Sequence, residues 1–156
     1  MNARELLILN FEEVRRRSIK IWKNISEEHL YWRPDSSALS CIEMVRHVLA
    51  TENIYHQIIL DRGALDSYES PLLSNPYGTV EDELKNAQPF REKFLQMVNG
   101  FATKELEEIR IVRADAKQDR RLGDYLLRIA YHESVHSGQL LDYLRTIKAP
   151  RPKIWD

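Results

Sequence analysis

Residues 120–147 read RRLGDYLLRIAYHESVHSGQLLDYLRTI and contain the longest apolar pattern in the chain. Apolar side chains recur at helical spacing along this stretch, at Leu122, Leu126, Ile129, Leu140, Leu144 and Ile147. This spacing predicts one long amphipathic helix. Such a helix needs neighbours to cover its apolar face.

Three more segments have helical periodicity, at about 4–25, 41–61 and 80–99. Ser40, followed three residues later by Glu43, is a capping-box signature for the start of the second helix. The segment 101–119 is expected to be a crossover that is extended around 109–113. The sequence therefore predicts an all-α fold, in which residues 1–156 form a single four-helix bundle domain with a long crossover connection.

The composition excludes several classes of protein. Lys and Arg number 23 against 24 Asp and Glu, so there is no positive excess for binding nucleic acid. The single cysteine, Cys41, excludes an internal disulfide and a multi-cysteine zinc site, and we expect it to be a small buried apolar residue. No apolar run approaches the ~20 residues of a membrane span, and no secretory signal is visible. We therefore expect a cytoplasmic protein that binds neither nucleic acid nor membrane.

Three of the five histidines share the inward side of two predicted helices. His132 and His136 are four residues apart, about 40° on the helical wheel, at the edge of the apolar face. His47 lies on the inward side of the second helix. His56 falls about 180° from His47, and His29 lies in a loop, so neither can join the same site. Hydrogen-bonded core histidines are the alternative to a metal site at His47, His132 and His136.

Residues 132–136 read HESVH, which formally matches the zinc motif His-Glu-x-x-His. Glu133 is therefore a candidate catalytic residue, as a general base, and a salt bridge to an arginine on a neighbouring helix is the alternative. A protease is not expected, because nothing indicates a site for an extended peptide. The consecutive residues Arg15, Arg16 and Arg17 spread around their helix and are interpreted as solvated surface. Gly138, in mid-helix, is expected to allow close approach of another helix.

The stretches EMVRHVLATE (43–52) and HESVHSGQL (132–140), with Trp32-Arg33-Pro34 upstream, resemble the DinB-like superfamily of metalloenzymes. The resemblance covers nearly the whole chain. It implies a four-helix bundle with unusual crossover topology, usually a homodimer, and a divalent metal ion held by His47, His132 and His136. Nickel, zinc and iron all suit three imidazoles, so the metal is left open.

Three functions follow from these observations. The first is transfer of a low-molecular-weight thiol to an electrophile, because the resemblance includes bacillithiol S-transferases and a mycothiol-dependent isomerase. The second is metal-dependent hydrolysis with Glu133 as the base. The third is a non-catalytic, dimeric, metal-binding stress protein.

Overall fold

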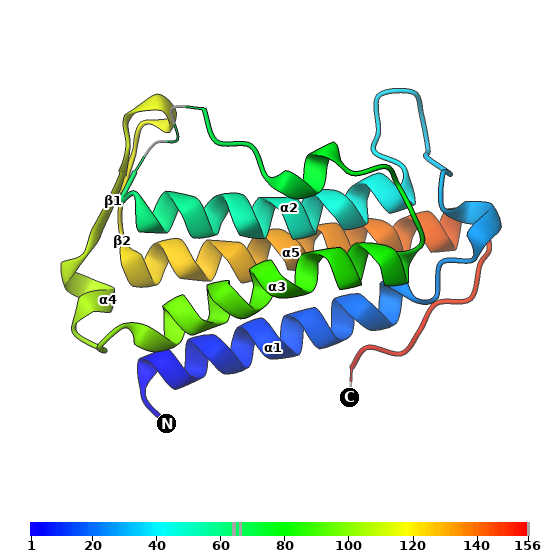
Figure 1. The fold of residues 1–156 in the computed structure, drawn as a ribbon. Helices are drawn as coiled ribbons and strands as arrows, with labels where there is room; N and C mark the ends of the chain where they lie inside the picture. The colour runs from blue at the N-terminus through cyan, green and yellow to red at the C-terminus, as the bar shows by residue number, and fades with distance from the viewer. Residues whose placement is uncertain (64, 66, 156) are drawn as a thin grey trace.

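Four long helices make up most of the computed structural model, which describes residues 1–63, 65 and 67–155 (Figure 1). Their bounds are α1 Ala3–Trp22, α2 Cys41–Leu60, α3 Val80–Gly100 and α5 Leu122–Thr146. All four lie where the apolar periodicity predicts helices, and the four-helix bundle is confirmed. None of the helices in the described part of the chain has the length and apolar composition needed to cross a membrane.

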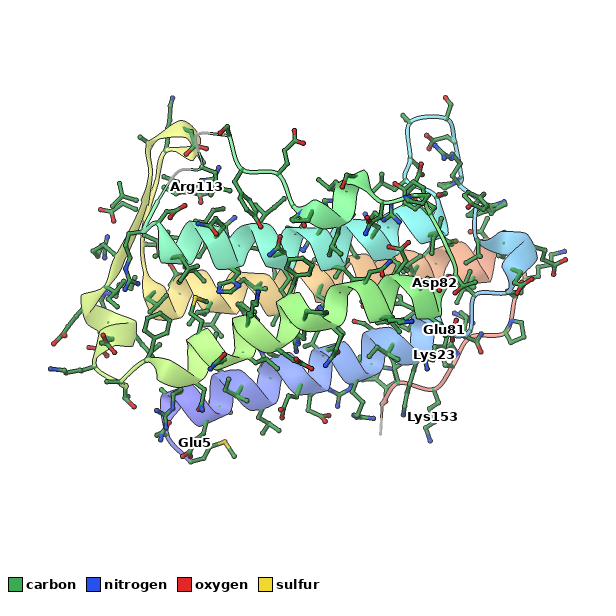
Figure 2. All side chains as sticks on the ribbon, in the orientation of Figure 1. Glu5, Lys23, Glu81, Asp82, Arg113 and Lys153 are labelled. Carbon is green, nitrogen blue, oxygen red and sulfur yellow. The ribbon has the colours of Figure 1, made fainter. Side chains whose placement is uncertain are left out.

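The helices pack in the ring order α1, α3, α2, α5, so consecutive helices are not always neighbours. Figure 1 shows α1 and α5 running in one direction while α2 and α3 run in the other. In Figure 2, Glu81 and Asp82 at the start of α3 lie at the same end of the bundle as Lys23, which follows α1. Because α2 and α3 are parallel neighbours, the chain must return along the bundle between them, which explains the long loop after α2.

Side-chain caps fix the starts of three long helices. Asn2, Ser40 and Thr79 each accept a hydrogen bond from the backbone three residues on, and the acidic side chain there bonds back to the cap. The Ser40–Glu43 capping box is therefore confirmed. Glu43 Oε2 accepts from the Ser40 backbone N–H at 2.7 Å, which sets the first residue of α2.

A small β-hairpin closes one end of the bundle. The short helix α4, Glu105–Glu108, leads into β1, Arg110–Arg113, which pairs antiparallel with β2, Gln118–Arg121. The extended segment around 109–113 is confirmed, but the helix expected from Arg120 begins at Leu122 because residues 118–121 pair with β1. Gly63 forms a parallel bridge to Val112, where a Cβ on Gly63 would come 2.5 Å from the Val112 carbonyl oxygen.

Short 3₁₀ turns occupy three connections: Glu27–His29, Pro71–Ser74 and Ala114–Ala116. The loop before α2 covers one end of the bundle through Trp32, which packs edge-on against Tyr143 with ring centroids 5.3 Å apart. Tyr31, in the same loop, is exposed. Cys41 is fully buried in the apolar core, as expected.

A network of four charged side chains crosses the middle of the bundle, and each comes from a different helix. Arg15 of α1 pairs with Glu133 of α5 and with Glu52 of α2, and Glu52 also pairs with Arg91 of α3. Each of the four is at most 8% exposed. The interpretation of Arg15 as solvated surface is therefore wrong, because Glu133 of the neighbouring α5 and Glu52 of the diagonally opposite α2 compensate its charge.

Candidate metal centre

His47, His132 and His136 come together between α2 and α5. The Nε2 atom of His132 lies 3.1 Å from Nε2 of His47 and 3.1 Å from Nε2 of His136. One ligand atom from each ring fits within a span of 4.8 Å. Zinc–nitrogen bonds of about 2.0–2.1 Å in a tetrahedral site place two nitrogens about 3.3 Å apart, close to this spacing.

Hydrogen bonding alone does not satisfy this arrangement. The Nε2 atom of His132 faces two ring nitrogens, yet it carries either one hydrogen or one lone pair. It can make one good hydrogen bond, so the other contact is left without a well-aligned partner. A cation among the three lone pairs removes this conflict. The donor set therefore fits a divalent metal ion better than a hydrogen-bonded core cluster.

The surroundings hold two of the rings in the neutral form that binds metal. Burial, followed by the neighbouring His136 and His47 rings, lowers the pKa of His132 to about 4. Burial and the His136 ring lower the pKa of His47 as well. Metal ligation requires a free lone pair, so these shifts favour binding at neutral pH.

Gln139 orients the third ring. Its Oε1 accepts a hydrogen bond from Nδ1 of His136 at 2.6 Å, which places the ring hydrogen on Nδ1 and leaves the Nε2 lone pair facing the cluster. A hydrogen bond to the far nitrogen is how metal-binding histidines are normally oriented.

Buried ion pairs next to two of the ligands fix the rotation of their helices. Arg46, which precedes His47, donates from Nε and Nη2 to the Glu83 carboxylate at 2.9 and 2.6 Å. Glu133, which follows His132, is held by Arg15. Because adjacent residues on a helix point about 100° apart, anchoring one sets the direction of the other.

The two remaining histidines lie elsewhere. His56 packs against Phe94 of α3, with ring centroids 6.1 Å apart, and His29 contacts the Ser26 hydroxyl at 2.7 Å. Within the described residues, no aspartate, glutamate or cysteine joins the three-histidine cluster. The wheel positions thus separated the five histidines as the structure does.

Glu133 points into the centre of the bundle. Both of its carboxylate oxygens accept hydrogen bonds from Arg15, at 2.8 and 3.0 Å. Burial would raise the pKa of Glu133, but the Arg15 charge and hydrogen bonds outweigh it, so its pKa is lowered. The observed contact is the salt bridge that the sequence offered as the alternative to a general base.

Gly138 does not serve the purpose expected of it. A Cβ built on Gly138 meets nothing within 4 Å, and the residue is exposed. The expectation that another helix of this chain approaches it closely is therefore wrong.

An aromatic wall that sequence analysis missed continues from the cluster towards the hairpin. The ring of Tyr55 meets His132 edge-on at 6.0 Å and Tyr125 at 5.7 Å, both between centroids. The Arg128 guanidinium lies over the Tyr125 ring, 5.6 Å from its centroid. Arg128 stands four residues before His132, so continuing the step of four that joins His132 to His136 would have found it.

Comparison with known proteins places this architecture in a family. The model of the DinB superfamily matches residues 10–140, which include all three histidines. The chain belongs to the DinB superfamily. Membership agrees with the resemblance carried by the two histidine-containing stretches and with the bundle topology.

Two DinB-like proteins of Bacillus subtilis share this fold. The uncharacterized protein YjoA of strain 168 is 25% identical over 141 residues, which span 89% of this chain and 87% of YjoA. The crystal structure of the DinB-like YjoA superposes with a TM-score of 0.71 at 18% identity, covering 96% of both chains. YfiT superposes with a TM-score of 0.74 at 15% identity, covering 94% of this chain and 89% of YfiT. YfiT is described as a probable metal-dependent hydrolase with an unusual four-helix bundle topology.

Proposed function

We propose that this DinB-like protein is a metal-dependent enzyme whose three-histidine centre activates a small nucleophile. One observation supports this most directly: three ring nitrogens converge, and no fourth aspartate, glutamate, cysteine or histidine in the described part of the chain joins them. Structural zinc sites use four protein ligands, whereas catalytic sites use three and leave a position for water or substrate.

The leading reaction is transfer of a low-molecular-weight thiol to an electrophile. A bound divalent metal ion supplies acidity, because it lowers the pKa of a thiol or water that it coordinates. The thiol sulfur forms a bond to the electrophilic carbon, the leaving group departs with its electron pair, and the thiol proton passes to solvent. This route needs no carboxylate base, which agrees with the use of Glu133 in the Arg15 ion pair.

Different residues of the chain would bind the metal ion, orient its ligands and fix the rotation of the ligand helices. His47, His132 and His136 would hold the ion, while Gln139 orients His136. The ion pairs Arg46–Glu83 and Arg15–Glu133 keep α2 and α5 in the rotation that aims the rings. Preorganised ligands of this kind keep the site ready before substrate arrives.

Metal-dependent hydrolysis is the second candidate, supported by the description of YfiT. Glu133 is poorly suited to act as its base, because both of its oxygens already accept from Arg15. Hydrolysis here would depend on the acidity that the metal gives to water.

The metal site is tested by elemental analysis of protein purified without chelators. We expect one divalent ion per chain, lost in His132→Ala and in His136→Ala. His56→Ala is the matched control, because His56 is half-buried outside the cluster and should leave the metal content unchanged. Failure to take up Ni²⁺, Zn²⁺ or Fe²⁺ when these are added would exclude the site.

The reaction is tested on the metal-loaded protein with a panel of thiols and an electrophilic chromophore, beside p-nitrophenyl esters for hydrolysis. Conjugation that depends on His132 supports the transferase. Ester cleavage alone would favour hydrolysis, and the absence of turnover in either assay would leave the non-catalytic metal-binding protein.

We also propose that the protein forms a homodimer. Leu127 and Tyr131 on α5 are 54% and 72% exposed, and an apolar groove of about 730 Å³ adjoins Leu127 and Leu6 of α1. Exposed apolar patches of this kind usually mark protein interfaces. Light scattering should give twice the chain mass of 18.4 kDa, and Leu127→Glu should reduce it to one chain. A monomeric wild-type protein at micromolar concentration would contradict the proposal.

A further inference from the structure

Arg128 carries a positive charge beside the histidine cluster that no acid of the described chain neutralises. Every other buried or half-buried arginine near the two ligand helices has a carboxylate partner: Arg15, Arg46, Arg91 and Arg113. Arg128 is half-buried, and its one hydrogen-bond partner in the described residues is the neutral Gln118 side-chain oxygen, 2.7 Å from Nη1. A partly desolvated charge without a counter-charge is costly.

The position of Arg128 relates it directly to the site. Arg128, His132 and His136 follow one another at steps of four on α5, so their side chains share one face with a rise of about 6 Å per step. A chain that only had to hold a cation would not gain by placing a fixed positive charge here.

The guanidinium is held in place and one edge of it is free. Gln118 of β2 engages Nη1, and the Tyr125 ring lies under the group. No hydrogen bond from Nε or Nη2 is made to any described residue, and these two atoms form the fork that pairs with both oxygens of a carboxylate. The Tyr55 ring contacts both His132 and Tyr125, so the two tyrosines form a continuous aromatic surface beside Arg128 and His132.

A buried hydroxyl adds a second unsatisfied donor at the same wall. Tyr125 is 1% exposed; the Arg113 guanidinium faces its Oη, and no acceptor for the hydroxyl hydrogen lies within the described part of the chain. Buried hydroxyl groups normally have a partner. An anion bound between the hairpin and α5 would supply this hydroxyl with an acceptor.

We propose that Arg128 binds the carboxylate of the substrate and thereby fixes which small molecules the three-histidine centre accepts. The inference rests on the proposed function, because it deepens the description of the same site. The substrate class is a small carboxylate-bearing molecule whose reacting atom lies about one helical turn, on the order of 6 Å, from its carboxylate. Arg128 is a specificity-determining residue and would leave the metal itself untouched.

The test compares two thiols that differ only in charge, 3-mercaptopropionate and 3-mercaptopropionamide. Both are titrated into Co²⁺-loaded protein, and binding is followed by the absorption of the cobalt–thiolate bond. We expect the wild-type protein to bind the carboxylate about tenfold or more tightly than the amide, as a charged hydrogen-bonded pair warrants. Arg128→Gln should abolish this preference, and Arg128→Lys should keep part of it.

Arg145→Gln is the matched control, since it removes the same charge from an exposed position near the end of α5. It should leave the preference intact. Cobalt content and far-ultraviolet circular dichroism should be the same for all variants. Equal affinities for the two thiols in the wild-type protein, or a preference that survives in Arg128→Gln, would overturn the proposal.

A measurement without metal separates this inference from the proposed function. Succinate is titrated into metal-free ¹⁵N-labelled protein, and the Nε–H signal of Arg128 is identified by its disappearance in Arg128→Gln. A saturable shift of this signal supports the anion site even if no metal were taken up. An unmoved signal would count against Arg128 even if the metal centre were proven.

Discussion

The guanidinium of Arg15 donates hydrogen bonds of 2.8 and 3.0 Å to the two carboxylate oxygens of Glu133, although the two residues are 118 positions apart in the sequence. The pair is buried, and it lies directly after the metal-ligand candidate His132 in the chain. Glu133 of the HESVH motif therefore holds α5 against α1. The preceding residue, His132, is the one that points into the three-histidine cluster.

Replacing Glu133 by glutamine should weaken the fold and leave the metal in place. The substitution removes a buried negative charge opposite Arg15, which should lower the free energy of unfolding by about 3 kcal/mol. Urea denaturation measures this loss, and elemental analysis of the folded variant should still find the ion. Glu13→Gln is the control, because Glu13 pairs with Arg16 and Arg17 at a partly exposed position, where each pair should contribute less than about 1 kcal/mol. Normal stability with turnover abolished in Glu133→Gln would instead identify a general base.

Replacing Gln139 by alanine should weaken metal binding and leave stability unchanged. The exposed Gln139 side chain contributes little to packing, but its oxygen fixes the hydrogen on Nδ1 of His136. Loss of such a partner typically costs about 10–100-fold in metal affinity. Competition with a zinc chelator measures this. Gln88→Ala, which removes an exposed amide bonded to Glu92 on α3, should bind zinc as the wild type does.

Cys41 should be unreactive in the folded protein. Burial raises the pKa of the Cys41 thiol to about 11, compared with 9.0 for an unperturbed cysteine. At pH 8 this reduces the thiolate fraction about a hundredfold, so alkylation should be at least that much slower in buffer than in concentrated urea. Mass spectrometry after timed quenching follows the reaction. Rapid labelling of the native protein would show that the α2 start opens readily.

The same shift predicts a loss of stability at alkaline pH. Because the pKa of Cys41 is higher in the folded than in the unfolded chain, its contribution is complete below about pH 9 and is lost as pH rises through about 11. Cys41→Ala has no thiol to ionise, so its stability should decline less than that of the wild type over this interval.

Replacing Gly138 by alanine should stabilise the protein. Gly138 lies within α5 with nothing within 4 Å of a new Cβ, and glycine in a helix interior costs about 1 kcal/mol relative to alanine. Thermal denaturation should show a melting temperature a few degrees higher. A lower melting temperature would indicate that another surface lies against Gly138 in solution.

Helical periodicity was enough to predict the four helices and to select three histidines. A wheel gives the direction of each side chain from its own helix, and the inward sides of α2 and α5 meet because the two helices are neighbours in this bundle. The same method failed for Arg15, because the buried acids that pair with it, Glu52 and Glu133, lie on other helices. The hydrophobic period of one helix does not show which charged residues on other helices will pair with its own.

The β-hairpin shows a second limit. Gln118-Asp119-Arg120-Arg121 has no apolar alternation, so nothing in β2 itself indicates a strand. It becomes extended because β1 pairs with it and because the Leu122 N–H bonds to the Ile109 carbonyl oxygen. Arg128 was missed for a related reason, since its partner Gln118 belongs to this hairpin.

The short distance between His47 and His132 has a thermodynamic consequence. The two rings are 85 residues apart in sequence, and their Nε2 atoms are 3.1 Å apart in space. An ion can bind all three rings only when α2 and α5 are packed together. Its binding therefore stabilises the folded state relative to the unfolded chain. Each tenfold rise in free metal above the dissociation constant adds about 1.4 kcal/mol to the free energy of unfolding. The supply of the metal would thus govern how long the protein persists, in addition to whether it reacts.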